Sequence, residues 1–399
     1  MTRRLEAEVE KVVRSQNCSG CGGCAQVSAA ITMKMDSEGF LRPEFDLTKP
    51  TSTEHEASEF RKICPGVRVD APAPQGSIRH PYLGAVVDSW QAWACDPVVR
   101  NRGSSGGTLT AISNWIVDSP GGGAVVGAAA SPQDPRHTVS LTIMSKDEAL
   151  RASGSRYAPA SNLSAENALH EDAFVGKPCE ISSLSQIVKI RRLDRSPLRM
   201  SFFCAGVPSQ HATNRLVSKL GVGNDSPIAS LQYRGDGWPG QFRAQDKDGN
   251  VGRMSYDDSW GKELGPTMQL RCKICPDGVG ESADIVAGDF WSADEDGYPV
   301  FAEQEGVSVL IARTVRGREA VLAAAAAGYL HLEPIDLGSV ASVQPLQTLR
   351  RRTLCGRLLG RLFAGKRIPN YRGFGLLRFS ILSPAENLRA AAGTFRRSI

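Results

Sequence analysis

Hydrophobic positions along this chain recur with two different spacings, and the alternation between them predicts a mixed α/β fold. Apolar runs of the length of buried strands occupy six segments, at 84–95, 121–130, 139–145, 173–176, 199–206 and 306–314. Apolar residues at helical spacing occupy three segments, at 106–119, 145–154 and 211–221. Strands that alternate with helices in this way favour an α/β core.

The pattern changes at both ends of the chain, which predicts three parts. Residues 1–16 are amphipathic and predict a short helix, and residues 31–46 alternate as a strand, turn at Asp36–Gly39 and return. A Pro-, Gly- and Ala-rich stretch at 70–82 predicts a linker. Basic and apolar residues interleave over 354–378, as in an amphipathic helical extension. We therefore expect a cysteine-bearing N-terminal module at 1–75, a larger mixed α/β domain at 76–345 and a basic helical extension at 346–399.

Composition is that of an ordinary globular protein. The 399 residues include ten cysteines, and 41% of the chain is hydrophobic and 22% charged. No apolar run reaches the roughly 20 residues of a membrane span, and the N-terminal sequence lacks the apolar region of a secretory signal. We therefore expect a cytoplasmic protein, in which clustered cysteines serve as metal or redox ligands rather than as disulfides.

Positive charge is concentrated near the C-terminus. Residues 350–399 hold twelve Lys and Arg against one acidic residue, Glu386, whereas the whole chain carries a net charge of only +5. Such blocks contact nucleic acid, anionic lipid or acidic partners, or they pack against the fold or stay solvated. Because no nucleic-acid-binding motif accompanies this block, we expect no nucleic-acid partner. Two alternatives remain: a solvated or packing extension, and an interaction surface, which includes peripheral contact with a membrane.

The segment CSGCGGC at 18–24 carries three cysteines at the spacing of a bacterial-type ferredoxin motif, C-x2-C-x2-C-x3-C-P. The fourth cysteine position of that motif is Ser28. In two-cluster ferredoxins the fourth cysteine ligates the other cluster, so the partner of this triplet is a later Cys-Pro, supplied here by Cys64. The positions where the other cysteines of a second cluster would lie (54, 57 and 60) hold none. The spacing therefore predicts a single N-terminal iron–sulfur site of Cys18, Cys21, Cys24 and Cys64.

Two alternatives for these four thiols stay open, namely a structural zinc site and thiols without a ligand. Zinc accepts four cysteines, although its sites usually combine two C-x2-C pairs. Two single cysteines at the ends of predicted strands and a later C-x2-C pair form a second set, which consists of Cys179, Cys204, Cys272 and Cys275. These residues would make another four-cysteine site if the fold brings them together. Cys95 and Cys355 remain as core or bystander thiols.

Six stretches of the chain occur in the order found in one known family: CSGCGGC, DPVVRNRGSSGGTLTAI, GSRYAPAS, VGKPCEISSL, FFCAGVPS and RCKICPDGVGESADIVAGDFW. Over roughly residues 15–340 the chain resembles the coenzyme F420 hydrogenase/dehydrogenase beta-subunit family, which includes 7-hydroxymethyl chlorophyll a reductase. The second cysteine set matches cysteine positions of that family. Lys177 and Ala205 depart from its pattern, and these departures affect the expected substrate more than the expected cluster.

The resemblance implies an iron–sulfur flavoprotein oxidoreductase with one or two [4Fe–4S] clusters and FAD. It implies a small ferredoxin-like N-terminal module, a mixed α/β flavin domain, and a second cluster on the later cysteine set. Electrons would enter at the N-terminal cluster from a ferredoxin or a redox partner subunit. They would reach FAD through the second cluster and then a small-molecule substrate, for which coenzyme F420 is the first candidate.

A flavin needs a phosphate site, and the Gly/Ser-rich loop before the helix predicted at 106–119 is the candidate. An ordinary helix cap is the alternative for this loop, and a surface turn is the alternative for GSRYAPAS. The expected cofactor-binding residues are Arg102, Ser104, Ser105, Gly106, Gly107, Ser155, Arg156 and Tyr157. No catalytic acid or base can be assigned. Two other function classes stay open: a non-enzymatic electron-relay subunit without flavin, and a zinc-binding scaffold.

Overall fold

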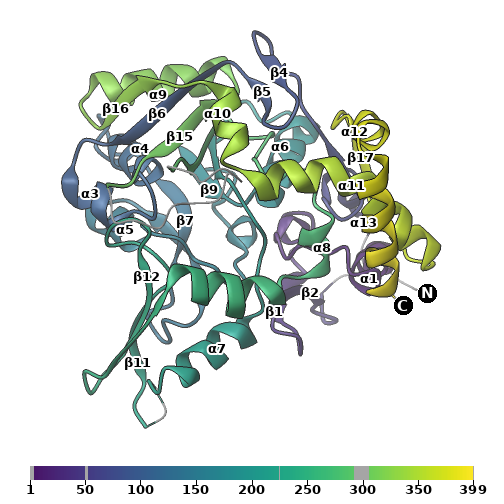
Figure 1. Ribbon diagram of the computed structural model, residues 1–399, viewed down its shortest axis with the longest axis horizontal. Helices are drawn as coiled ribbons and strands as arrows, with labels where there is room; N and C mark the ends of the chain where they lie inside the picture. Colours follow the sequence, from purple (N-terminus) through teal and green to yellow (C-terminus); the bar gives the residue numbers. More distant parts are fainter. Residues whose placement is uncertain (1–3, 50–52, 224, 292–304, 399) are drawn as a thin grey trace.

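A mixed eight-stranded sheet lies at the centre of the computed structural model, which describes residues 4–49, 53–223, 225–291 and 305–398. The strand order is β16-β6-β15-β14-β10-β9-β7-β8 (Figure 1). The strands are β6 Asp88–Ala94, β7 Val125–Ala130, β8 Thr138–Ile143, β9 Ala173–Gly176, β10 Leu198–Phe202, β14 Ile285–Asp289, β15 Ser308–Ala312 and β16 Leu330–Pro334. Four neighbours, β14, β10, β9 and β7, run parallel, and the other pairs are antiparallel. The predicted mixed α/β fold is confirmed.

Helices cover both faces of this sheet, because successive strand residues point to opposite sides. One face carries α3 Pro97–Arg102, α4 Thr108–Val117, α5 Lys146–Arg151 and α9 Val315–Ala326, and the other carries α6 Pro178–Arg191. Val125 and Ala173 pack in the hydrophobic cluster of the first face. Their neighbours Val126 and Phe174 pack in the cluster of the second face with Leu184 of α6. The helices predicted at 106–119 and 145–154 are thus confirmed as α4 and α5.

A smaller antiparallel sheet lies beside the main one, at the lower left of Figure 1. Its strands are β11 Ile228–Gln232, β12 Gln241–Asp246 and β13 Val251–Ser255, and it packs with α7 Gln210–Lys219 and the π-helix η3 Asp257–Leu264. Leu216 of α7 and Phe242 of β12 are fully buried in their shared cluster. The helix predicted at 211–221 is confirmed as α7, whereas the three strands and η3 were not predicted.

The N-terminal module consists of α1 Arg4–Arg14, a 3-10 turn η1 Gly23–Gln26, the hairpin β1 Ile31–Met35 with β2 Leu41–Phe45, and α2 Glu54–Ile63. The predicted helix and hairpin are confirmed within the described residues. Leu5, Val9 and Phe60 hold α1 and α2 together in a small hydrophobic cluster. Thr53 and Glu56 form a reciprocal capping box that fixes the start of α2.

The segment between this module and the main sheet is more ordered than the predicted linker at 70–82. It includes β3 Arg68–Asp70 and β4 Ile78–His80, and β4 pairs antiparallel with β5 Gly84–Val86. The single strand expected at 84–95 is therefore two strands, β5 and β6, which belong to different sheets. The short β4–β5 pair was not predicted, because polar residues and prolines interrupt the apolar pattern of this segment.

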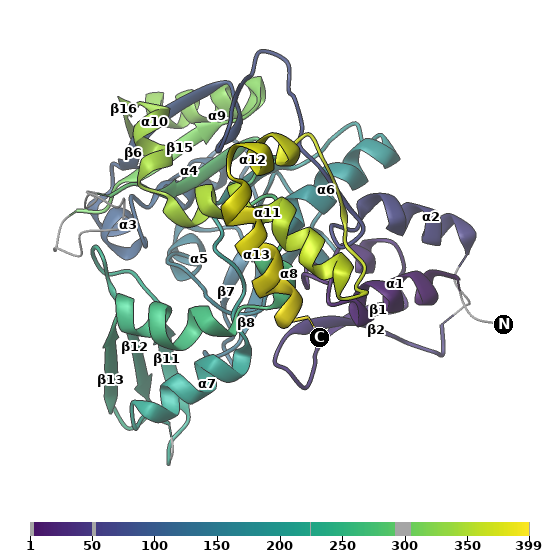
Figure 2. The ribbon, with the colours of Figure 1, turned by 45° about the vertical axis from the view of Figure 1, so that its right-hand side comes forward.

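The C-terminal extension is folded onto the rest of the chain. After α10 Leu337–Ser342 it forms α11 Pro345–Phe363, β17 Asn370–Arg372, α12 Leu376–Leu382 and α13 Pro384–Arg396. Gly356 and Gly360 let α13 approach α11 closely, because an added Cβ would lie 2.1 Å from Asn387 O and 2.3 Å from Ala391 O. β17 pairs parallel with β3, and two views place α11 and α13 beside α8 Leu270–Lys273 (Figure 1, Figure 2). No helix among the described residues has the length and apolar character needed to cross a bilayer.

Candidate functional site

The first cysteine set gathers around one small cavity in the N-terminal module. Cys18, Cys21 and Cys24 lie in or just before η1, and Cys64 ends α2, so that all four line this cavity together with Val9. Burial raises the pKa of the Cys64 thiol, and Cys21 and Cys18 raise it further by charge repulsion. Burial also raises the pKa of the Cys24 thiol, and Cys21, Cys18 and Cys64 raise it further. The structure therefore brings the four predicted cysteines together.

The second cysteine set gathers at one edge of the main sheet. Cys179 follows β9, and Cys204 follows β10. Because these strands are parallel neighbours, their carboxyl ends lie at the same edge. Cys272 lies on α8, and Cys275 follows it. Burial raises the pKa of Cys204 to about 12, with further contributions from Cys272 and Cys275.

The two sets adjoin each other. Burial raises the pKa of Cys179, Lys177 opposes this rise, and Cys21 of the first set adds to it. The contact is tight, because a Cβ added to Gly23 would lie 2.1 Å from the Ser183 Oγ of α6. Close packing against α6 explains Gly23, whereas Gly22 has a φ of 80° and an added Cβ there would lie 2.3 Å from Ser161 Oγ.

Arg271, which sequence reasoning missed, lies between the two sets. Its side chain is 2% exposed, and Nη2 donates to Pro65 O at 2.9 Å, beside Cys64. Burial opposes its charge, but Tyr371 and the cysteines at 275, 179 and 272 raise its pKa above the ordinary value. The Arg-Cys pair at 271–272 is the sequence signal that could have revealed it.

These sets are neighbouring thiols rather than preformed sites for one ion. In the described part of the chain, no three His, Cys, Asp or Glu side chains lie close enough together to hold a single metal ion. Four partly or fully buried thiols in each set nevertheless match the donors that iron–sulfur clusters require, because soft thiolates are the ligands that iron–sulfur chemistry selects. The donor set and its burial therefore fit a cluster at each position.

A large cavity opens beside the second set, at the carboxyl edge of the parallel strands. It has a volume of about 340 Å³, and Cys204 forms part of its wall. The wall is mostly apolar or aromatic, with Tyr157, Trp238, Trp260 and Trp291 among its side chains. This combination of an apolar wall with a few polar groups is typical of a cofactor site.

Six of the eight expected cofactor-binding residues line this cavity: Ser104, Ser105, Gly107, Ser155, Arg156 and Tyr157. Gly107 has a φ of 70° and precedes α4, whose first residues also line the cavity. The other two expected residues, Arg102 and Gly106, are not in the wall. Arg102 Nη1 donates to Asp236 Oδ1 at 3.0 Å. An added Cβ on Gly106 would lie 2.5 Å from Ala92 O, which shows that this glycine packs against the sheet.

Arg156 lines the cavity, but most of its donors are already used. Nε donates to Thr138 Oγ1 at 3.1 Å, and Nη1 donates to Leu231 O at 3.2 Å. Nη2 donates to Pro135 O and His137 O at 2.8 and 2.9 Å. These bonds join the β7–β8 connection to the smaller sheet and use four of the five N–H groups, so the side chain mainly fastens the wall and keeps one Nη1 N–H for a ligand.

Arg234 is the cavity cation that sequence reasoning missed. It is 1% exposed, Nη1 donates to Asp289, and its guanidinium lies over the Trp238 ring at 4.4 Å. Its Nη2 has no hydrogen-bond partner among the described residues, and neither has Nε1 of Trp238 or Trp291. Three orphaned donors in one wall fit a bound group that carries acceptors. The turn-forming sequence RGDGWPG after β11 was the available signal.

Lys177, which departs from the family pattern, is buried between the cavity and the second cysteine set. Its Nζ donates to Ala160 O at 2.6 Å and to Glu180 Oε1 at 2.8 Å, and both charged residues line the cavity. Burial opposes its charge, but Glu180 and Cys179 raise the pKa of Lys177. The substitution therefore places a cation at the wall shared by the cavity and Cys179.

A second, larger cavity of about 1070 Å³ adjoins the first, and Trp238 and Tyr256 line both. Three arginines, Arg100, Arg243 and Arg253, line this second cavity. It also contains the side chain of Cys95, one of the two cysteines outside the four-member sets.

Comparisons with known proteins place the chain in a family. Models for the N-terminal and C-terminal parts of the coenzyme F420 hydrogenase/dehydrogenase beta subunit match residues 89–166 and 170–337, together more than half of the chain. An uncharacterized protein of Methanocaldococcus jannaschii is 24% identical over 379 residues, which cover 86% of this chain and 96% of that protein. A chain of the F420-reducing [NiFe] hydrogenase complex from Methanosarcina barkeri is 20% identical, with a TM-score of 0.49, over 69% of this chain and 95% of that chain. Both matching models describe a subunit of a redox enzyme. The chain therefore belongs to the coenzyme F420 hydrogenase/dehydrogenase beta-subunit family.

Proposed function

We propose that this protein is an iron–sulfur flavoprotein oxidoreductase that passes electrons between two [4Fe–4S] clusters, FAD and an organic substrate. One observation carries the proposal: eight cysteines form two adjoining sets of four, and Cys204 of the second set also lines the first cavity, the one of about 340 Å³. Sites that share walls in this way suit electron transfer from one to the next.

The chain's own residues would hold these groups as follows. The first set would ligate one cluster and the second set the other, through thiolates. When bound, the clusters would supply one-electron steps and the flavin would couple them to two-electron chemistry. Because burial raises the pKa of the Cys24, Cys64, Cys179 and Cys204 thiols, these residues favour the protonated form until a positively charged group binds them.

The cavity supports FAD through its donors and its aromatic side chains. The N-terminus of α4 and the hydroxyl of Ser104 suit a pyrophosphate, because backbone N–H groups at a helix start attract anions. The Ser105 hydroxyl donates to Val307 O instead. Arg234 Nη2 and the Nε1 groups of Trp238 and Trp291 have no partner among the described residues, and they would donate hydrogen bonds to acceptors of the bound flavin. Aromatic rings in the wall would pack against the isoalloxazine and exclude water.

The adjoining cavity is the proposed substrate site. Arg100 pairs with Glu305 there, whereas Arg243 and Arg253 form no ion pair among the described residues and suit an anionic substrate. Trp238 and Tyr256 form the boundary that this cavity shares with the flavin cavity. Coenzyme F420, which the family description names, is the substrate we propose. The electron donor would be a ferredoxin or a redox partner subunit.

Anaerobic purification followed by iron, sulfide and flavin analysis tests this function. We expect about eight iron atoms and one FAD per chain, and reduction of F420 by the reduced protein. Iron without flavin would favour a non-enzymatic electron-relay subunit. Zinc without iron would refute the proposal, and iron with flavin but no F420 turnover would remove only the proposed substrate.

A further inference from the structure

The C-terminal extension, which lies beyond the matched family models, contacts two of the three segments that carry the second cysteine set: the loop after β10 with Cys204, and the segment with Cys272 and Cys275. Its donors reach five backbone carbonyls there. Gln347 Nε2 and Arg350 Nη1 donate to Cys204 O at 3.2 and 3.4 Å, and Arg350 Nη2 also donates to Ala205 O. Arg357 Nη1 donates to Lys273 O at 2.8 Å, and Tyr371 Oη donates to Ile274 O at 2.9 Å.

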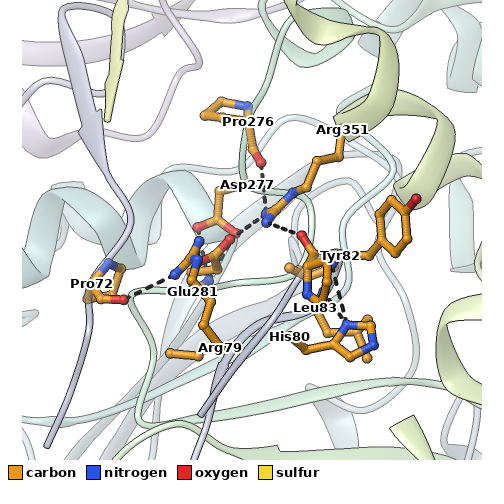
Figure 3. A network of polar contacts seen from close by, with 12 residues as sticks. Pro72, Arg79, His80, Tyr82, Leu83, Pro276, Asp277, Glu281 and Arg351 are labelled. Carbon is orange, nitrogen blue, oxygen red and sulfur yellow. Dashed lines mark hydrogen bonds and ion pairs between the residues drawn. The ribbon is translucent and has the colours of Figure 1, made fainter. Parts of the chain in front are cut away.

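The fifth carbonyl belongs to Pro276, directly after Cys275, and it accepts a bond from Arg351 Nη2 at 3.3 Å. Figure 3 shows Arg351 pointing from α11 toward Pro276 and Glu281. Glu281 is fully buried and pairs with both Arg351 and Arg79. Since an unpaired buried charge is costly, this network fastens α11 firmly to the loop after Cys275.

Arg350 also brings a charge to the second cysteine set. It is 9% exposed, and no carboxylate among the described residues forms an ion pair with it. Its guanidinium donates to the backbone carbonyls of Cys204 and Ala205, which places the charge directly beside the loop that carries Cys204. A cation without an acidic partner stabilises a nearby negative group more than a paired one does.

The neighbouring arginine provides a contrast on the same helix. Arg352 pairs with Glu386 of α13 through two hydrogen bonds at 2.9 and 3.0 Å, and both side chains are 36% exposed. Arg352 has the same charge as Arg350 and nearly the same position in the sequence, but its side-chain hydrogen bonds reach none of the loops that carry cysteines.

We propose that residues 345–372 complete the second cysteine site: they clamp the segments of Cys204 and of Cys272 and Cys275 through backbone carbonyls, and Arg350 is a positioning residue whose charge raises the reduction potential of the group held there. This inference rests on the proposed function, because that group is taken to be a [4Fe–4S] cluster. A reduced cluster carries one more negative charge than the oxidised form, so a fixed cation beside it favours reduction.

A redox titration followed by electron paramagnetic resonance tests the charge. In the anaerobic protein with both clusters, Arg350→Gln should lower the reduced-to-oxidised ratio of one cluster about tenfold at a fixed ambient potential, a shift of about 59 mV for one electron. The other cluster should not shift, and neither should any cluster in Arg352→Gln. Arg350→Lys should restore most of the ratio because it keeps the charge. Equal shifts in the two glutamine variants, or no shift in Arg350→Gln with its iron retained, would overturn the proposal.

Amide hydrogen exchange tests the clamp without any iron. In iron-free protein, Tyr371→Phe and Arg357→Gln should each increase exchange within residues 270–276 severalfold, whereas Arg352→Gln should leave it unchanged. Unchanged exchange in both Tyr371→Phe and Arg357→Gln would refute the clamp. This experiment tests the proposal even where Arg350→Gln cannot be purified with its clusters. Absence of iron from the wild-type protein would instead refute the proposed function, so the two failures are distinguishable.

Discussion

A substitution at Gly23 tests whether the N-terminal module docks against the helix that carries Cys179. An added Cβ there would lie 2.1 Å from Ser183 Oγ and 3.1 Å from Ser183 Cβ. Gly23 has no positive φ, so Gly23→Ala introduces this clash without backbone strain. Overpacking of a well-packed contact typically costs about 1–3 kcal/mol, and we expect Gly23→Ala to lower the free energy of unfolding by that amount.

Ser183 offers a compensating change. Its Oγ is buried without a hydrogen-bond partner among the described residues, so Ser183→Ala by itself should be close to neutral. In the double variant the nearest remaining atom would be the Cβ at 3.1 Å, a tight but accommodated contact. The double-mutant cycle should therefore show a favourable coupling of at least about 1 kcal/mol.

Urea denaturation of the anaerobic protein, with the iron content of each variant, measures these differences. Gly261→Ala is the matched control, because its added Cβ would meet only Asp257 Oδ1 at 3.4 Å. If Gly23→Ala proved as stable as this control, or if Ser183→Ala failed to restore the loss, the close packing of the triplet on α6 would be wrong.

Three further predictions follow from other parts of the structure. Cys64→Ser should remove about half of the iron, if each set holds one of two equal clusters, whereas Cys355→Ser should remove none; equal losses would contradict the assignment. Although burial opposes it, Arg199 and Arg316 lower the pKa of Asp284 to about 2 from 3.8, so its contribution of about 2 kcal/mol should be complete above about pH 4 and disappear as the pH falls toward 2; in Asp284→Asn, stability should lose this dependence. Because α12 and α13 expose basic and apolar residues such as Leu377, Ile381 and Arg389, the protein should sediment with anionic but not with neutral vesicles; Ile381→Asp should abolish this binding, and unchanged sedimentation of that variant would contradict the assignment.

The periodic parts of the fold were predictable because their signals are local. Apolar spacing located α4, α5 and α7, and alternation located the β1–β2 hairpin. The strands β11 to β13 were not predicted, because polar residues and turns interrupt their short apolar patterns. Two strands of this small sheet expose one face, so only part of each strand carries the hydrophobic signal.

The cysteine sets were predictable to different degrees. The Cys-Pro step of the ferredoxin pattern predicted Cys64 as the partner of the triplet, and the four thiols line one cavity. The later set depended on the fold, because only the parallel pairing of β9 with β10 brings Cys179 near Cys204. Arg271 and Arg234 were missed because their only sequence signals, a neighbouring cysteine and a glycine-rich turn, do not say whether an arginine will be buried or which carbonyl it will reach.

The contacts of the C-terminal extension explain part of the uneven charge distribution along the chain. The basic block at 350–399 is neither a wholly solvated tail nor a uniform surface, since Arg350, Arg351 and Arg361 are buried within the fold. Clusters held by eight thiolates would place considerable negative charge in the interior, and such charge is stable only beside buried cations. Lys177 and Arg271 supply part of that compensation from the family core, and Arg350 supplies more from the extension. We infer that the positive charge beyond residue 345 is partly an internal counter-charge, so removal of the extension should impair the second cysteine site even though none of its thiols is lost.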